Sequence, residues 1–373
     1  MSLLRFLLTN QLKCHRQAQK TGGFTLLELL MAMVLAFLVI TPLLGFVVNI
    51  LETDRKEQAK ANSEQELKAA LDYIAQDLQQ AVYIYDADGL DKTTTPRRSP
   101  NSGIKDQIPP LGRGATGCDN NSNCTPVLVF WKRELRNKVM PARNITPNNV
   151  DCANANVALK CDDAYVYSLV GYYLITGNPP GGNTWSSAAR IARFQVRDGV
   201  VAPSQRRTST PSYIRYGGSE LKPDQGFKAF DLKGIGTLKQ KMNNWKKESN
   251  NYSFDFGSNV LVDYIDLPNP KWQQDPPPGG IKCDRTNINL TRGTPIPREQ
   301  KVPSDPKMNS FYACVSSPGV NANSNYARIY IRGNALARIQ KTNPPPSFSD
   351  NNSAYFPTAS IQVQGNGFLY NRQ

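Results

Sequence analysis

The chain has 373 residues and a net charge of +14. Beyond an N-terminal segment, this length is enough for one large soluble domain or for a small core with long insertions. Its single histidine, His15, lies within the first 23 residues. If those residues are removed, the remaining chain offers no histidine for a Ser-His-Asp or Cys-His arrangement or for a metal site. Because GxSxG and phosphate-loop motifs are also missing, we expect no enzyme, although folding could still bring two carboxylates together for catalysis.

The N-terminal segment combines a basic leader with a long apolar run. Residues 1–23 contain four basic residues and no acid, and end in Gly22-Gly23. Phe24 follows, and Glu28 is the only charged residue in the run from 24 to 51. As a helix this run would be ~42 Å long, and a bilayer core is ~30 Å thick. Basic residues before an apolar span keep that end in the cytoplasm. A secretory signal is cut after its apolar segment, whereas here Gly-Gly precedes it.

The sequence KTGGFTLLE, residues 20–28, resembles the type IV prepilin signal, which type II secretion pseudopilins also use. The resemblance implies that a prepilin peptidase cuts after Gly23 and that Phe24 becomes N-methylated. It also implies that Glu28 pairs with the N-terminal amine of a neighbouring subunit. A charge inside hydrocarbon costs at least ~2.5 kcal/mol, so an intramembrane carboxylate is a functional candidate by default. The alternative is a plain signal anchor with Glu28 near the headgroups, which explains neither Gly-Gly nor Phe24.

The helix is expected to continue beyond the apolar run. No glycine or proline occurs from 52 to 85. Apolar residues recur there at steps of three and four, as on one face of an amphipathic helix: Leu67, Ala70, Leu71, Ile74, Leu78, Ala81, Val82 and Tyr85. Gly89 is a suitable stop. Within the apolar half, Pro42 is expected to kink the helix and Gly45 to soften it.

Three acids, Asp86, Asp88 and Asp91, follow the amphipathic stretch. They offer carboxylates for calcium, the one cofactor considered, but the spacing of a complete calcium loop is missing. A solvated helix end is the simpler interpretation.

The remainder of the chain is expected to be β-rich with long loops. Eight β-branched or aromatic runs read as strands: 127–131, 165–175, 191–196, 260–265, 312–315, 327–331, 335–339 and 360–363. Arg332-Gly333-Asn334, between two of these runs, is a hairpin-turn candidate.

Cysteine count favours disulfides. Removal of residues 1–23 takes away Cys14 and leaves six cysteines in an exported domain. Six cysteines allow fifteen pairings, of which local closure favours Cys118–Cys124, Cys152–Cys161 and Cys283–Cys314. Zinc is the competing use, but the chain has no CxxC.

The stretch SEQELKAALDYIAQDLQQAVYIYDADG, Ser63 to Gly89, resembles minor pseudopilins of the J or W type, nearest to the cyanobacterial group associated with hormogonium polysaccharide secretion. This implies an α+β, pilin-like fold in which a long N-terminal helix packs on an antiparallel sheet. The expected parts are a leader (1–23), a transmembrane and assembly half of the helix (24–51), an amphipathic half (52–89) and an exported domain (90–373).

The resemblance also implies a role and a location. The role is that of a minor subunit in a pilus-like or secretion-like filament that supports polysaccharide export and gliding motility. Its partners would be the prepilin peptidase, major and other minor pilins, the inner-membrane assembly platform and, before assembly, the lipid bilayer. The subunit would cross the inner membrane once, with its N-terminus cytoplasmic and its domain periplasmic or extracellular, and would reach the cell surface in the filament.

The alternative function is a filament-tip binding module for DNA or an anionic polysaccharide. Seven lysines lie between 222 and 247, and Trp245 and Trp272 stand beside lysines. Such residues can hold phosphates and stack on bases or sugars. Scattered solvated charges and aromatics packed in the core are the simpler reading.

Overall fold

The computed structural model describes residues 23–94, 101–110, 115–116, 118, 123–142, 151–154, 156, 160–177, 185–202, 212–233, 235–248, 252, 254–255, 259–271, 274–288, 296–317, 325–367 and 369. The chain divides into two compact units, Met1–Arg55 and Lys56–Gln373. The apolar part of the N-terminal helix belongs to the first unit, and the β-sheets belong to the second.

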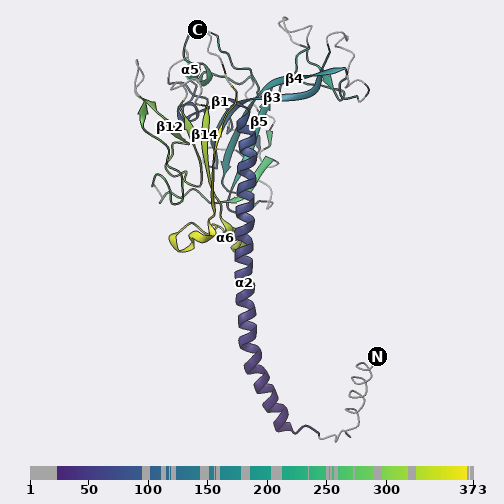
Figure 1. The fold of residues 1–373 in the computed structure, drawn as a ribbon, viewed down its shortest axis with the longest axis vertical. Helices are drawn as coiled ribbons and strands as arrows, with labels where there is room; N and C mark the ends of the chain where they lie inside the picture. The colour runs from purple at the N-terminus through teal and green to yellow at the C-terminus, as the bar shows by residue number, and fades with distance from the viewer. Residues whose placement is uncertain are drawn as a thin grey trace, which may run out of the picture. The chain divides into compact units, whose positions relative to one another are not determined.

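The first unit consists, in its described part, of the start of one long helix. Helix α2 covers Leu26–Gln79, and every residue from 23 to 55 is exposed (Figure 1). The helix is long and apolar enough to cross a membrane. It continues through Pro42 and Gly45, so neither residue ends it, and the kink at Pro42 stays a prediction.

In the second unit the helix becomes amphipathic and ends earlier than expected. Its buried face includes Leu67, Leu71, Ile74 and Leu78, as predicted, but α2 ends at Gln79 rather than near residue 85 or 89. Residues Ala81–Ile84 form strand β1, in which all four residues are buried, and Ala87–Asp91 form the short helix α3. The sequence pattern suggested a longer helix because β1 is buried on both faces, and such a strand is apolar at every position, including those that would continue the apolar face of the helix.

The first sheet of this unit has five strands in the order β1-β3-β4-β5-β9, all antiparallel to their neighbours. The strands after β1 are β3 (Cys124–Pro141), β4 (Cys161–Ile175), β5 (Ala189–Arg197) and β9 (Val260–Ile265). Because β5 pairs with β4 only from Ser168 onward, β3 and β4 extend beyond it as a two-stranded arm (Figure 1).

The second sheet has four antiparallel strands in the order β12-β13-β14-β15. These are β12 (Glu299–Val302), β13 (Phe311–Ser316), β14 (Tyr326–Arg332) and β15 (Thr358–Gln364). The long helix and the two antiparallel sheets confirm the α+β class.

Seven of the eight predicted strands are confirmed within these two sheets. The eighth, 335–339, was wrong, because Ala335–Gln340 form helix α6. The expected hairpin turn before it is a helix start. The side chain of Asn334 accepts a hydrogen bond from the backbone N–H of Ala337 at 3.0 Å, which caps the helix.

Shorter elements complete the second unit. They are helix α5 (Leu238–Asn243), the 3-10 helix η4 (Asp350–Tyr355) and three two-residue strand pairs: β2 (Ala115–Thr116) with β8 (Phe254–Asp255), β6 (Arg215–Tyr216) with β7 (Ser219–Glu220), and β10 (Asn287–Ile288) with β11 (Ile296–Pro297).

The three expected disulfides, Cys118–Cys124, Cys152–Cys161 and Cys283–Cys314, are confirmed. They enclose 6, 9 and 31 positions of sequence, so each bridge is local.

One core joins α2 to both sheets. It contains the buried face of α2, Trp131 and Leu169 of the first sheet, and Ile329 of the second. Trp131 is fully buried and lies edge-on to the rings of Phe227, Phe230 and Trp245. Its indole N–H donates to the hydroxyl of Tyr85 at 3.0 Å, so its one polar atom is satisfied.

Candidate assembly segment

The predicted cleavage point lies directly before the start of α2. Gly22 and Cys14 lie outside the described residues, whereas Gly23 is described and has open space on the side where another residue would carry its Cβ. Thr25 caps the helix. Its carbonyl accepts from the N–H of Glu28 at 3.0 Å and from the N–H of Leu29 at 3.1 Å, and its hydroxyl lies 3.3 Å from the N–H of Glu28. A chain beginning at Phe24 would therefore begin almost at its first helical turn.

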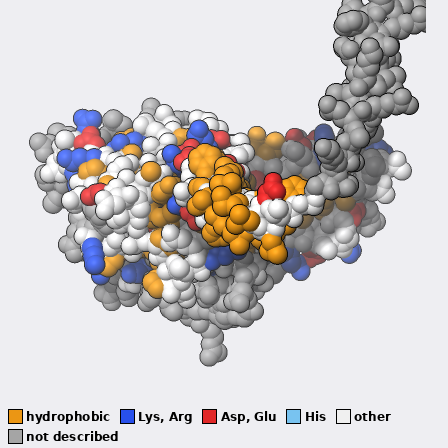
Figure 2. Space-filling view, turned by 90° about the horizontal axis from the view of Figure 1, so that it is seen from below, with side chains coloured by type: hydrophobic (Ala, Val, Ile, Leu, Met, Phe, Trp, Pro, Cys, Tyr) orange, Lys and Arg blue, Asp and Glu red, His pale blue; other side chains and the backbone are white. Residues whose placement is uncertain are grey.

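Glu28 is the one charged residue of an apolar surface that surrounds the helix. Phe24 is 78% exposed and Leu26 is 86% exposed. The apolar side chains that follow, as far as Leu51, are exposed on all sides of the helix and appear in Figure 2 as a continuous orange surface. Glu28 lies in the first turn, where the helix dipole favours a negative charge. A helix apolar all round requires a surrounding of lipid or of other apolar helices.

The far end of α2 is held to the first sheet by a buried carboxylate. Asp77 lies on the buried face of α2 and is 8% exposed. Its carboxylate accepts hydrogen bonds from Lys132 Nζ at 2.9 Å, Tyr172 OH at 2.7 Å and Arg193 Nε at 2.7 Å, which belong to β3, β4 and β5. Burial alone would raise the pKa of Asp77, but Arg193 and Lys132 outweigh it and hold the pKa below its usual value.

This cluster was not predicted from the sequence, because the three partners lie 55 to 116 positions further along the chain. One signal was available. Asp77 stands seven residues after Ala70 and directly before Leu78, on the apolar face of the predicted helix. A lone acid on such a face requires a partner.

Two of the three acids considered for calcium, Asp86 and Asp88, are paired with lysines. Lys239 Nζ lies 2.6 Å from Asp86 Oδ2 and 2.6 Å from Asp88 Oδ2, and Lys92 is 2.6 Å from Asp88 Oδ1. Burial raises the pKa of Asp86, which is fully buried, against the opposing effect of Lys239. Burial alone would raise the pKa of Asp88, but hydrogen bonds from Lys239 and Lys92 outweigh this effect and lower the pKa to about 2.

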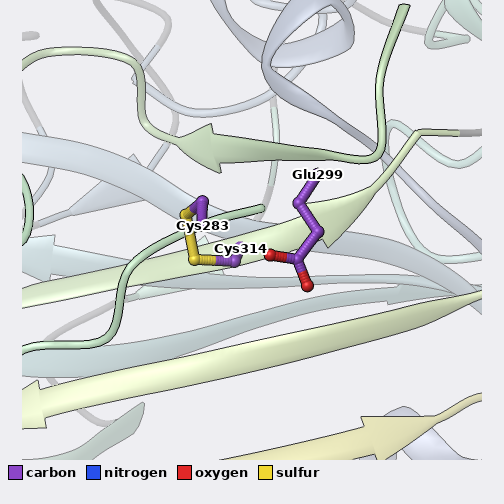
Figure 3. Close-up of side chains that lie close together, drawn as sticks. All are labelled: Cys283, Glu299 and Cys314. Atoms are coloured by element: carbon purple, nitrogen blue, oxygen red, sulfur yellow. A yellow bond between two sulfur atoms is a disulfide. The ribbon is translucent and has the colours of Figure 1, made fainter. Parts of the chain in front are cut away.

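Among the described residues, the one group of three acidic, cysteine or histidine side chains close enough to share an ion is elsewhere: Cys283, Glu299 and Cys314. Asp86, Asp88 and Asp91 do not form such a group. The sulfurs of Cys283 and Cys314 are joined in a disulfide, and Glu299 lies beside them (Figure 3). A metal requires free thiolates, and Glu299 already accepts from Arg328 Nε at 2.9 Å. The trio is therefore a disulfide beside an ion pair.

Part of the basic stretch from 222 to 247 is engaged within the domain. Lys222 lies 2.8 Å from Glu220, and Lys228 lies 3.0 Å from Glu248. Trp245 is 3% exposed, and its indole N–H donates to the carbonyl of Lys228 at 2.7 Å. Trp245 is therefore part of the core of the domain and offers no surface on which a base or sugar could stack. Trp272 lies outside the described residues.

Comparison with protein-family models, with curated proteins and with solved structures found no match to this chain. What is established is an α+β chain whose N-terminal helix is long and apolar enough to cross a membrane and which carries three disulfides.

Proposed function

We propose that the chain is a minor pilin-like subunit of a type IV pilus-like or type II secretion-like filament. The observation that carries the proposal is Glu28, a single exposed carboxylate on a helix that is otherwise apolar and exposed from Phe24 to Leu51. In lipid such a charge is costly. A neighbouring subunit that begins at Phe24 supplies a positive amine, so assembly removes the cost that insertion imposes.

The same helix serves both states of the subunit. Before assembly its apolar half crosses the inner membrane once, with the leader on the cytoplasmic side and the disulfide-bonded unit outside. After assembly the same surface packs against apolar helices of neighbouring subunits. The three disulfides support export, because disulfides persist in oxidising compartments. The narrower role, polysaccharide export and gliding motility, is supported by the resemblance of residues 63–89 alone.

Mass spectrometry of the mature N-terminus tests the processing step. We expect a chain that starts at N-methyl-Phe24 in cells with a prepilin peptidase and an intact leader in cells without it. A cut beyond Leu51, or an intact leader in both strains, would reject the proposal.

Substitution of Glu28 tests the assembly step. Glu28→Leu should still be inserted and cut after Gly23 but should be missing from filaments, because the neighbour's amine loses its counter-charge. Glu52→Leu is the matched control, since it removes the next acid of the same helix, just after the apolar run. Incorporation of the Glu28 variant at the level of the Glu52 variant would refute the pairing.

A further inference from the structure

The disulfide Cys283–Cys314 lies on a face of the second sheet where two cations flank it. In antiparallel pairs, residues directly opposite each other lie on the same face of the sheet. Cys314 of β13 is opposite Lys301 of β12 on one side and opposite Arg328 of β14 on the other. Cys314 is fully buried, and Lys301 is 6% exposed. The Cys314 side chain therefore lies in a row of three whose outer two are positively charged.

Lys301 is a buried cation that has no acidic partner among the described residues. Its ammonium lies 4.8 Å from the centroid of the Tyr312 ring and forms no ion pair or hydrogen bond with any residue in the described part of the chain. Burial lowers the pKa of Lys301, and the charge of Asp275, the largest opposing effect, does not offset it. Because a buried charge is costly unless it is paired, the site favours an anion next to Lys301.

The carboxylate beside the disulfide does not supply that anion. Glu299 is 2% exposed and lies close to the two sulfurs (Figure 3). Its oxygen Oε1 accepts a hydrogen bond from Arg328 Nε at 2.9 Å, and the backbone N–H of Asp284 donates to Oε2 at 2.6 Å. Glu299 thus balances the charge of Arg328, and the charge of Lys301 remains. A thiolate at Cys314 would make the group electrically neutral.

The other two disulfides lack this arrangement. Cys124 is opposite Ile175, and Cys161 is opposite Pro141. In the described strand pairs, these two cysteines therefore lie opposite uncharged residues. A cation beside a cysteine favours its thiolate, so this effect is expected at Cys314 and not at the other two bridges.

The sulfur of Cys283 is reached by opening an irregular segment, residues 274–283, here called the strap. None of its residues belongs to a helix or a strand. Side chains of the sheet hold it, as where the hydroxyl of Tyr312 donates to the carbonyl of Ile281 at 2.7 Å. Segments without backbone pairing to a sheet open locally at a small fraction of the free energy of global unfolding. Such an opening uncovers Cys283, whereas Cys314 stays within β13.

We propose that Cys283–Cys314 is an exchangeable disulfide, opened by a thiol reductant through attack on Cys283. A thiolate of the reductant forms a bond to Sγ of Cys283, the S–S bond breaks, and its electron pair stays on Cys314. Lys301 and Arg328 stabilise this leaving thiolate, and a stabilised thiolate leaves faster. A second thiolate of the reductant then attacks the reductant's own sulfur in the mixed disulfide. Cys283 leaves and takes up a proton from water, and the reductant departs as its disulfide. Exchange at this bond does not depend on filament assembly.

A metal ion suits the reduced pair less well than a thiolate held by cations. The two sulfurs and Glu299 lie close enough together to bind one ion. However, Lys301 and Arg328 flank Cys314 and would repel a cation in a buried site, where charges interact more strongly than in water. Zinc is therefore expected to leave the reduction equilibrium unchanged.

Equilibration of the full-length chain in detergent with glutathione buffers at neutral pH tests the role of Lys301. Free thiols are trapped by acid and alkylation, and each disulfide is quantified by peptide mass spectrometry. In Lys301→Met, half-reduction of Cys283–Cys314 should require an at least ~10-fold higher ratio of squared reduced to oxidised glutathione than in the native chain. Lys301→Arg should keep the native value, and the other two disulfides should not shift. Lys307→Met, which removes an exposed lysine shortly after β12, is the matched control.

The sign of the shift separates this role of Lys301 from a structural one. If Lys301 only holds the strap through its contact with Tyr312, its loss loosens the strap and makes reduction easier. An easier reduction in Lys301→Met, or a midpoint equal to that of Lys307→Met, would overturn the proposal, and so would a zinc-dependent shift in the native chain. Near-ultraviolet circular dichroism of the oxidised variants verifies folding, and Lys301→Gln takes the place of Lys301→Met if that variant does not fold.

Discussion

Asp77 offers the sharpest test of how α2 is fixed to the domain. Replacing it with alanine removes the acceptor of three hydrogen bonds at once. Lys132, 5% exposed, would keep Glu134 at 3.8 Å as its nearest carboxylate, and Arg193 would lose its carboxylate partner on α2. Breaking a buried ion pair by removing one member costs ~3–5 kcal/mol, because the remaining charge stays buried without compensation. We expect about 3 kcal/mol, since Glu134 compensates Lys132 in part.

The matched control is Asp72→Ala. Asp72 is an exposed acid on the same helix, so its loss should change stability by less than ~0.5 kcal/mol. The stability of both variants is measured by thermal unfolding of the full chain in detergent, followed by the fluorescence of the buried Trp131 and Trp245. With an unfolding entropy of ~2.1 cal/mol/K per residue, a loss of about 3 kcal/mol lowers the Tm by ~4–5 °C. Equal Tm values for the two variants would refute the reasoning.

The pH dependence follows from the same carboxylate. Its folded-state pKa lies below the unfolded one, so its stabilising contribution is present above the unfolded pKa. It is lost as the pH falls through the folded pKa. The Tm difference between the native chain and Asp77→Ala should therefore be full at neutral pH and shrink below pH ~4. A difference that grows on acidification would contradict the assigned direction.

Three further predictions concern the rest of the domain. Replacing both Cys283 and Cys314 with serine should lower the free energy of unfolding by about 3.7 kcal/mol, because their disulfide closes a loop of 31 positions. Replacing both Cys118 and Cys124 should lower it by about 2.2 kcal/mol, because that loop spans only 6 positions. Denaturant unfolding without reductant measures the two losses and shows which is larger. Lys239→Met should destabilise the domain by ~3 kcal/mol, since the fully buried Asp86 loses its cation. Because Lys239 already occupies these carboxylates, millimolar calcium should leave the Tm of the native chain unchanged, and a rise of several degrees would restore the calcium hypothesis.

Local signals in the sequence predicted most of the elements. Alternating β-branched and aromatic runs located seven strands, and short spacing paired the six cysteines after residue 23 correctly. The failures have a common cause. The runs 81–85 and 335–339 carry apolar patterns that suit either a helix or a strand, and burial by distant segments decided between them. Ala81–Ile84 pairs with β3, and Asn334 caps α6 at the point where a turn was expected.

Contacts between distant residues could not be predicted in the same way. No residue near Asp77 in the sequence predicts that Lys132, Tyr172 and Arg193 are its partners, because only the pairing of β3, β4 and β5 brings them together. Likewise, the sequence alone could not decide whether the lysines between 222 and 247 are scattered solvated charges or a surface that binds a polyanion. In the structure Lys239 turns inward to Asp86 and Trp245 is buried. Composition records how many charges there are, whereas their availability depends on which acids the fold places beside them.

The two halves of α2 explain why Asp77 matters for the proposed function. In the proposed filament, neighbouring subunits would hold the chain through the apolar half of α2, so a pulling force on the filament would reach the domain along α2. The contacts that would resist such a force are made by the amphipathic half of the helix. Leu71 and Ile74 pack in the core, Asp77 binds three strands of the first sheet, and Arg338 of α6 donates to Ser63 at 3.0 Å. These contacts lie along residues 63–78 of the helix, so they share the load. Loss of Asp77 should therefore weaken assembled filaments under shear before it prevents their assembly, whereas loss of Glu28 should prevent assembly and leave the domain as stable as before.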